Sequence, residues 1–168
     1  VCAQCGQLNG VHQDTDDFCQ AVYADDGGKT YAQAYDAADT DAFQSRMHDI
    51  YLPKADFLFG ALKAENLKPE SESYAGLGAG SGYFVSALIA AGAQSETGYE
   101  VSETQVAMAD KMLGTGHMVH HGLGDTASVA AALDVGVVSM IGVLEHLQNP
   151  RTVLAALARN KAVHTVYL

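Results

Sequence analysis

The sequence predicts an α/β fold built on one doubly wound, mostly parallel sheet with helices on both faces. Two observations lead to this class. After residue 70, short apolar runs alternate with stretches of helical periodicity, which is the pattern of parallel strands joined by crossover helices. A glycine-rich turn also lies between the first expected strand and the first expected helix of that region. A helical lead-in is expected before the sheet, which is expected to be truncated after about its fifth strand.

The alternating region spans residues 70–168 and is expected to form a Rossmann-like core. The expected strands are 74–77, 97–101, 117–121, 135–140 and 162–168, and the expected helices are 83–91, 103–113, 126–132 and 150–159. Two of the helix starts carry capping signals. Ser102 with Gln105 forms a capping box, and Asn149 precedes Pro150 at the first helical position.

Two regions precede this core. Residues 1–30 are expected to form a loop-rich lead segment, because they contain a pair of adjacent glycines and little apolar periodicity. Residues 31–69 are expected to form a helical lead-in, in which Phe43, Met47 and Ile50 share one apolar face.

The excess of acidic residues indicates which classes of substrate the chain can bind. The chain has 168 residues, with 20 acidic against 9 basic side chains and a net charge of -11. Such a surface repels phosphate backbones, so we expect a small-molecule or protein substrate and no nucleic acid. No apolar run has the length of a membrane span and no signal-peptide pattern opens the chain, so a soluble, cytoplasmic protein is expected. Because the chain starts at Val1 and stops within an expected strand, it is expected to be a fragment cut at both ends.

The glycine-rich turn is the most informative motif. It contains Gly78, Ala79, Gly80 and Gly82, and glycines in this place permit positive φ and let a ligand approach the backbone. Glu100 follows at the end of the second expected strand, where a carboxylate can accept hydrogen bonds from both hydroxyls of a ribose. The third glycine comes one residue earlier than in the dinucleotide motif G-x-G-x-x-G. The spacing therefore favours a nucleoside ligand without a pyrophosphate.

These residues carry a resemblance to the class I S-adenosylmethionine-dependent methyltransferases, of the kind that acts on small molecules or sugars. Residues 78–84 look like motif I of that family, Glu100 matches its ribose-binding acid, and residues 142–147 resemble the segment after its fourth strand. The resemblance implies S-adenosylmethionine as the cofactor, with the glycine loop against its methionine and ribose portions. One position departs from the pattern. Family members usually carry Asp or Glu, which helps to hold the methionine amino group, where this chain has Gly76.

The resemblance implies further cofactor contacts. Asp125 matches the place where the family holds the adenine, and it could equally cap the helix that follows. Ile141 and Gly142 would lie at the carboxyl ends of the parallel strands, against the sugar or the methionine. His146 is the candidate general base, because a neutral imidazole can take a proton from an attacking hydroxyl or amine. The favoured alternative is that Glu145 and His146 form a structural element, as in many relatives.

In the lead-in, the resemblance extends to Tyr35 and Arg46. Small-molecule methyltransferases can clasp the carboxylate of the cofactor with a tyrosine and an arginine from helices before motif I. An arginine suits this task because its planar fork meets a carboxylate with two hydrogen bonds. The alternative for Arg46 is an ordinary charge on a helix surface.

Cys2, Cys5 and Cys19 are the candidate metal ligands. The first two form a CxxC pair, which is half of a zinc knuckle and looks like part of the zinc-binding region of some sugar C-methyltransferases. The spacing to the third cysteine is irregular, so free thiols in a reducing compartment are favoured over zinc.

The expected activity is transfer of a methyl group from S-adenosylmethionine to a small-molecule acceptor, such as a sugar or another metabolite. An NAD-dependent oxidoreductase of the same fold class and a non-catalytic cofactor-binding module are the alternatives. The sequence leaves open the acceptor, the methylated atom and the oligomeric state.

Overall fold

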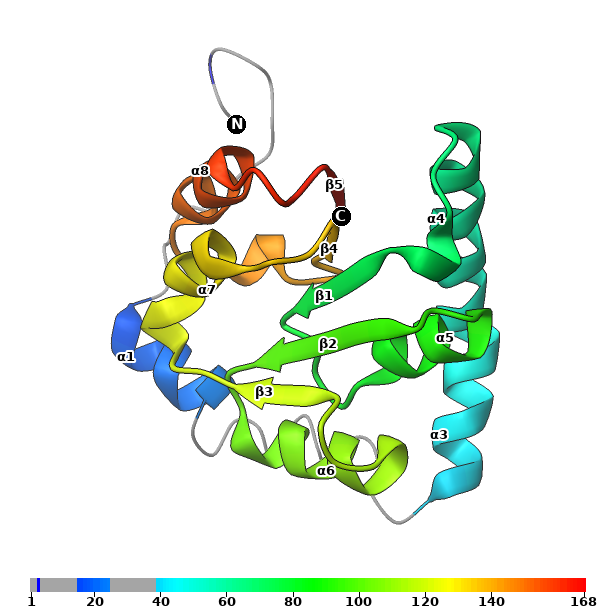
Figure 1. Cartoon of the computed structure of the whole chain (residues 1–168). Helices are drawn as coiled ribbons and strands as arrows, with labels where there is room; N and C mark the ends of the chain where they lie inside the picture. Colours follow the sequence, from blue (N-terminus) through cyan, green and yellow to red (C-terminus); the bar gives the residue numbers. More distant parts are fainter. Residues whose placement is uncertain (1–2, 4–14, 25–38) are drawn as a thin grey trace.

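The computed structural model describes residue 3 and residues 15–24 and 39–168 (Figure 1). The described helices are α1 (Asp16–Cys19), α3 (Thr40–Arg46), α4 (Leu52–Ala64), α5 (Tyr83–Ala91), α6 (Glu103–Leu113), α7 (Thr126–Ala132) and α8 (Pro150–Arg159). The strands are β1 (Ser73–Leu77), β2 (Ser95–Glu100), β3 (Met118–His120), β4 (Val137–Ser139) and β5 (Thr165–Tyr167). Short π-helical stretches lie at Gln20–Ala24 and Met47–Tyr51, and 3-10 turns at Pro69–Ser71, Leu123–Asp125 and Leu144–His146. None of the described helices is long and apolar enough to cross a membrane.

The described strands form one parallel sheet in the order β3-β2-β1-β4-β5. This arrangement confirms the doubly wound α/β class that the alternating pattern predicts. The helices α5 to α8 begin and end at the expected residues, whereas the ends of the strands differ from the expected ranges by a few residues. Helix ends are better predicted here because glycines and capping residues mark them in the sequence.

The strand order places a ligand crevice beside β1. The chain passes from β1 to β2 and β3 on one side, and then returns to β4 on the other side of β1. The carboxyl ends of β1 and β4 therefore border a switch point, where open α/β sheets bind their ligands. In Figure 1 the arrowheads of β1, β2 and β3 mark this end of the sheet, and they point towards the side on which α1 lies.

Helices cover both faces of the sheet. On one face, α4 and α5 pack against Tyr74 of β1 and Val137 of β4. On the other face, α7 and α8 pack against Leu77 and its neighbours. Because successive side chains of a strand alternate between faces, Gly76 and its register partner Ser139 belong to the α4 and α5 face. These two residues lie near the carboxyl ends of β1 and β4.

The lead-in differs from the prediction at Ile50. Phe43 and Met47 are buried as expected, but Ile50 is 41% exposed, and Tyr51 packs against the core instead. The π-helical stretch Met47–Tyr51 explains the change, because its i to i+5 hydrogen bonds widen the turn and rotate the residues that follow. A regular helical period of about 3.6 residues cannot predict the wider turn, which packs Tyr51 against the core in place of Ile50.

The described residues 16–24 are helical, within the range where the sequence predicts a loop-rich segment. The Oγ1 of Thr15 accepts a hydrogen bond from the N–H of Phe18 at 3.2 Å. Asp16 and Asp17 lie in the first turn, where negative charge interacts favourably with the helix dipole. This helix brings Val22 and Tyr23 beside the residues that follow the carboxyl end of β2.

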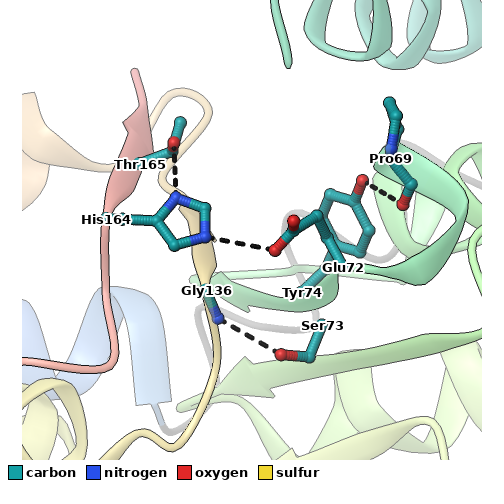
Figure 2. A network of polar contacts seen from close by, with 7 residues as sticks. All are labelled: Pro69, Glu72, Ser73, Tyr74, Gly136, His164 and Thr165. Atoms are coloured by element: carbon teal, nitrogen blue, oxygen red, sulfur yellow. Dashed lines mark hydrogen bonds and ion pairs between the residues drawn. The ribbon is translucent and has the colours of Figure 1, made fainter. Parts of the chain in front are cut away.

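A polar network joins the amino ends of β1, β4 and β5 (Figure 2). The Nε2 of His164 lies 3.1 Å from Oε2 of Glu72, and its Nδ1 lies 3.0 Å from Oγ1 of Thr165. The N–H of Gly136 donates to Oγ of Ser73 at 3.2 Å. A Cβ at Gly136 would lie 2.5 Å from the His164 Nε2 and 2.7 Å from the Glu72 Oε2, so the absence of a side chain there leaves room for the pair. The network connects β5 to β1 at the end of the sheet opposite the glycine-rich turn.

Candidate functional site

Two adjoining cavities border the glycine-rich turn. The first, of about 250 Å³, includes Arg46, Tyr51, Gly76 and Ser139 in its wall and is called the Arg46 cavity. The second, of about 200 Å³, includes Val22, Tyr23, Glu100, Leu123 and His146 and is called the Glu100 cavity. The residues common to both walls are Gly78, Gly80, Gln105 and Gly142. The two cavities therefore adjoin each other across the turn.

The backbone of the turn requires its glycines. Gly78, Gly80 and Gly82 have φ angles of +67°, +56° and +79°, a region that residues with a Cβ rarely adopt. A Cβ at Gly78 would also lie 2.6 Å from Cγ2 of Val143. The N–H of Gly78 donates to the Tyr99 carbonyl at 2.8 Å, which holds the start of the turn against β2. The turn thus presents backbone to both cavities.

Glu100 is buried at the end of β2 and organises the turn. Its Oε2 accepts a hydrogen bond from the N–H of Gly80 at 2.7 Å, and its Oε1 accepts from Val101 and Ser102 at 2.9 and 3.0 Å. A carboxylate has about four acceptor positions, so these bonds leave capacity for a ligand hydroxyl. The residue that the sequence singles out as a ribose acceptor is therefore also the residue that positions the glycine-rich turn.

Gln105 is a site residue that the sequence analysis missed. Its N–H donates to Oγ of Ser102 at 3.3 Å, as the capping box predicts. Its side chain does not complete the box, because its Oε1 accepts a hydrogen bond from the buried Ser81 of the glycine-rich turn, and the N–H of Ser102 donates to Glu100. The capping signal predicts the start of the helix, but it does not predict the hydrogen bond between Gln105 and Ser81.

Arg46 brings a positive charge from α3 to the first cavity. Its guanidinium carbon lies 5.6 Å from the centre of the Tyr83 ring. That ring stacks with Phe43 and with Tyr51, with centroid distances of 4.4 and 5.3 Å. Aromatic stacking of this kind orders both the guanidinium and the lead-in helices. The structure places Arg46 in a cavity wall, where the sequence alone left an ordinary surface charge as the alternative.

The absent acid at position 76 leaves space. A Cβ built on Gly76 would lie 3.5 Å from Oγ of Ser139 and 3.7 Å from the Cβ of Ala79, which are ordinary contact distances. Ser139 is 5% exposed, and it lines the Arg46 cavity together with Ala79 and Ile141. The cavity therefore has a hydroxyl at the point where the resemblance led us to expect a carboxylate.

Tyr74 lies in the same wall but cannot act as a base at neutral pH. Its hydroxyl donates to the carbonyl of Pro69 at 2.7 Å. Burial, with the negative charges of Glu72 and Glu70 nearby, raises the pKa of Tyr74 well above its ordinary value. The phenol stays protonated and serves as a structural donor.

Of two further cofactor contacts predicted from the sequence, the structure places one in the cavity walls and the other outside them. Gly142 lines both cavities, whereas Asp125 is exposed, and its neighbours Leu123 and Thr126 line the Glu100 cavity in its place. Asp125 is the N-cap residue of α7, but its side chain makes no capping hydrogen bond. Asp125 thus takes the N-cap position that the alternative gave it without the side-chain hydrogen bond, and its adenine contact stays a prediction.

His146 lies in the wall of the Glu100 cavity, on the 3-10 turn after β4. Its Nδ1 is 3.0 Å from the hydroxyl of Tyr23, and the two ring centres are 5.5 Å apart. Val22 and Tyr23 line the same cavity, although the sequence analysis assigned them to a loop. No periodic or motif signal marked them, since their position depends on how the lead segment folds back on the core.

Tyr35, Cys2 and Cys5 lie outside the described residues. Cys19 is buried and lines a third cavity of about 510 Å³ beside α1, which shares Leu123, Thr126, His146 and Leu147 with the wall of the Glu100 cavity. In the part of the chain that the structure describes, no group of three His, Cys, Asp or Glu residues could hold a metal ion. The zinc hypothesis for the three cysteines therefore stays a prediction.

A family model described as a methyltransferase domain matches residues 75–160. Among solved structures, the chain is similar to magnesium protoporphyrin IX methyltransferase ChlM from Synechocystis PCC 6803 with bound SAM, at 18% identity over 90% of this chain and 74% of that one, with a TM-score of 0.58. The same enzyme with bound SAH gives 19% identity, coverages of 84% and 65%, and a TM-score of 0.55.

A third similar structure is a putative RNA methyltransferase, PH1948, from Pyrococcus horikoshii. It has 21% identity, coverages of 69% of this chain and 60% of that one, and a TM-score of 0.51. The chain thus spans less than two thirds of the length of the last two structures. A search of curated proteins finds no match. Because these identities are low, the similar structures show only that the fold is shared.

Proposed function

The chain belongs to the methyltransferase-domain family, as a class I S-adenosylmethionine-dependent enzyme, and from this premise we propose that it methylates a small-molecule acceptor. Family membership confirms the resemblance read from the glycine-rich turn, Glu100 and residues 142–147. It leaves the NAD-dependent oxidoreductase without support.

One observation carries the proposal for cofactor binding: the two cavities adjoin at the glycine-rich turn, with Glu100 in the wall of one, and Arg46 together with Glu96 in the wall of the other. The Glu100 cavity suits a nucleoside, because a buried carboxylate accepts hydrogen bonds from ribose hydroxyls. The Arg46 cavity suits an amino-acid end, because a guanidinium pairs with a carboxylate. S-Adenosylmethionine carries both groups, joined through its sulfonium.

When bound, this cofactor supplies an activated methyl group on the sulfonium. The residues of the chain then need only to bind, align and exclude water. The glycine-rich turn and Gly142, which line both cavities, would lie along the middle of the cofactor. A base is required only where the acceptor is protonated, and His146 is the candidate from the sequence.

The small-molecule acceptor is supported by charge. The net charge of -11 opposes binding of an anionic polymer. The similar structures do not decide between classes of acceptor, since one is described as a magnesium protoporphyrin enzyme and another as an RNA enzyme. The proposal for the acceptor therefore rests on the acidic composition of the chain.

The test is isothermal titration of the chain with S-adenosylhomocysteine and, in parallel, with NADH. Micromolar binding of S-adenosylhomocysteine and none of NADH is the expected result. Binding of NADH alone would contradict the proposal, and binding of neither would favour the non-catalytic module.

Replacing Gly76 by aspartate is expected to strengthen binding of S-adenosylhomocysteine. The position has room for a side chain and lies in the Arg46 cavity, so a carboxylate there can attract the ammonium group of the ligand. A gain of about fivefold is expected, which corresponds to roughly 1 kcal/mol, a typical net value for a hydrogen bond. Titration calorimetry measures the gain.

Gly76→Asn is the matched control, because it has the same shape without the charge. 5′-Methylthioadenosine, which lacks the amino-acid end, should bind equally to all three proteins. Equal affinities of the Asp and Asn variants for S-adenosylhomocysteine would show that no ammonium lies near position 76.

A further inference from the structure

We propose that Tyr23 is a cofactor-binding residue, and that the segment 15–24 forms the outer wall of the nucleoside site. This inference rests on the proposed function, because it identifies the ligand of the Glu100 cavity as the nucleoside half of S-adenosylmethionine. Neither the family match, which begins at residue 75, nor the motif residues extend to this segment.

The first observation is the composition of the cavity wall. Val22 and Tyr23 line the Glu100 cavity together with Glu100, Leu123 and Val143. The core strands and turns supply the acid and some of the apolar side chains, and the lead segment supplies an aromatic ring and a branched aliphatic side chain. A nucleoside needs both kinds of contact, because its sugar forms hydrogen bonds and its flat base packs against apolar or aromatic groups.

The second observation is the contact that holds this wall in place. The hydroxyl of Tyr23 lies 3.0 Å from Nδ1 of His146, and the two rings are tilted by 48° with centres 5.5 Å apart. His146 belongs to the 3-10 turn that follows β4, at the switch point of the sheet. The bond therefore connects the lead segment to the loop that also carries Gly142 and Val143.

The third observation is that the segment is anchored on its other side. Cys19 is 2% exposed, and the π-helical stretch Gln20–Ala24 lies against the 3-10 turn Leu123–Asp125. Thr15 caps the helix through the N–H of Phe18. Because Thr15 caps the helix and Cys19 is buried, the segment presents Tyr23 from a formed element.

This arrangement assigns His146 a structural role. Through its Nδ1, the imidazole holds Tyr23 and with it the segment 15–24 in place. This role agrees with the alternative in which Glu145 and His146 form a structural element. Tyr23 then contacts the nucleoside, and His146 acts as a positioning residue through Tyr23.

The proposal is tested by calorimetry and stopped-flow dissociation with two probes, S-adenosylhomocysteine and 5′-methylthioadenosine. Tyr23→Ala is expected to weaken both by about tenfold, since it removes an aromatic contact and a hydrogen bond. Tyr23→Phe keeps the ring and is expected to weaken both by about threefold, mainly through faster dissociation. Thermal melts confirm that each variant is folded, and the phenylalanine variant keeps the test valid if the alanine variant is not.

His146→Gln provides the matched partner. Because it removes the same bond, the double variant with Tyr23→Phe should bind no more weakly than the weaker single variant. If the unaltered chain binds neither probe, the proposed function itself fails. If it binds both and the Tyr23 variants bind equally well, the cofactor site stands and the role of Tyr23 is refuted.

Discussion

Glu100→Ala is expected to reduce the affinity for S-adenosylhomocysteine by about hundredfold. Hydrogen bonds to a charged group contribute about 1.5–3 kcal/mol each, and roughly 3 kcal/mol corresponds to this factor. The substitution removes the acceptor of ribose hydroxyls, and it also releases the N–H groups of Gly80, Val101 and Ser102 that the carboxylate now holds. The affinity therefore falls for two reasons: the ligand loses its hydrogen bonds to the carboxylate, and the glycine-rich turn is no longer held in position.

Titration calorimetry measures the loss, and two variants control it. Glu100→Gln keeps the shape and one acceptor oxygen, so an intermediate affinity is expected. Glu103→Ala removes the same charge from an exposed position on the following helix and should leave the affinity unchanged. Unaltered binding by Glu100→Ala would mean that the nucleoside does not lie in the Glu100 cavity.

Gly82→Ala is expected to destabilise the fold by about 3 kcal/mol. The residue has a φ of +79°, and a Cβ there would lie 2.7 Å from Cδ1 of Leu113 and 3.0 Å from the Cβ of Ala109. A left-handed conformation costs about 1–2 kcal/mol for a residue with a Cβ, and overpacking costs about 1–3 kcal/mol more. Urea denaturation followed by circular dichroism measures the free energy of unfolding.

Gly80→Ala is the comparison within the same turn. Its φ is +56°, but nothing lies within 4 Å of the added Cβ, so only the conformational cost of about 1 kcal/mol should remain. Equal losses in the two variants would mean that α6 moves away from position 82 without cost. A larger loss for Gly82→Ala establishes that the turn and α6 are packed as described.

Most of the fold could be predicted from the sequence because its signals are local. The glycines and the Ser102 cap mark helix ends, and the alternation of short apolar runs with helical stretches marks a parallel sheet. The same locality led to the glycine-rich turn and Glu100, since a turn motif and a strand end lie at a fixed spacing, and the structure brings the two into contact. The structure confirms the sheet, and the family match confirms the kind of enzyme.

What only the tertiary structure decided are one local irregularity of a helix and the contacts between residues far apart in the chain. The exposure of Ile50 depends on a π-helical turn, and the side chain of Gln105 bonds to Ser81 rather than to its own helix start. Tyr23 reaches the Glu100 cavity because the lead segment folds back onto the loop after β4. Sequence periodicity determines which face of an element is apolar, but the partner of a polar side chain is determined by packing, where the nearest available donor or acceptor is bonded.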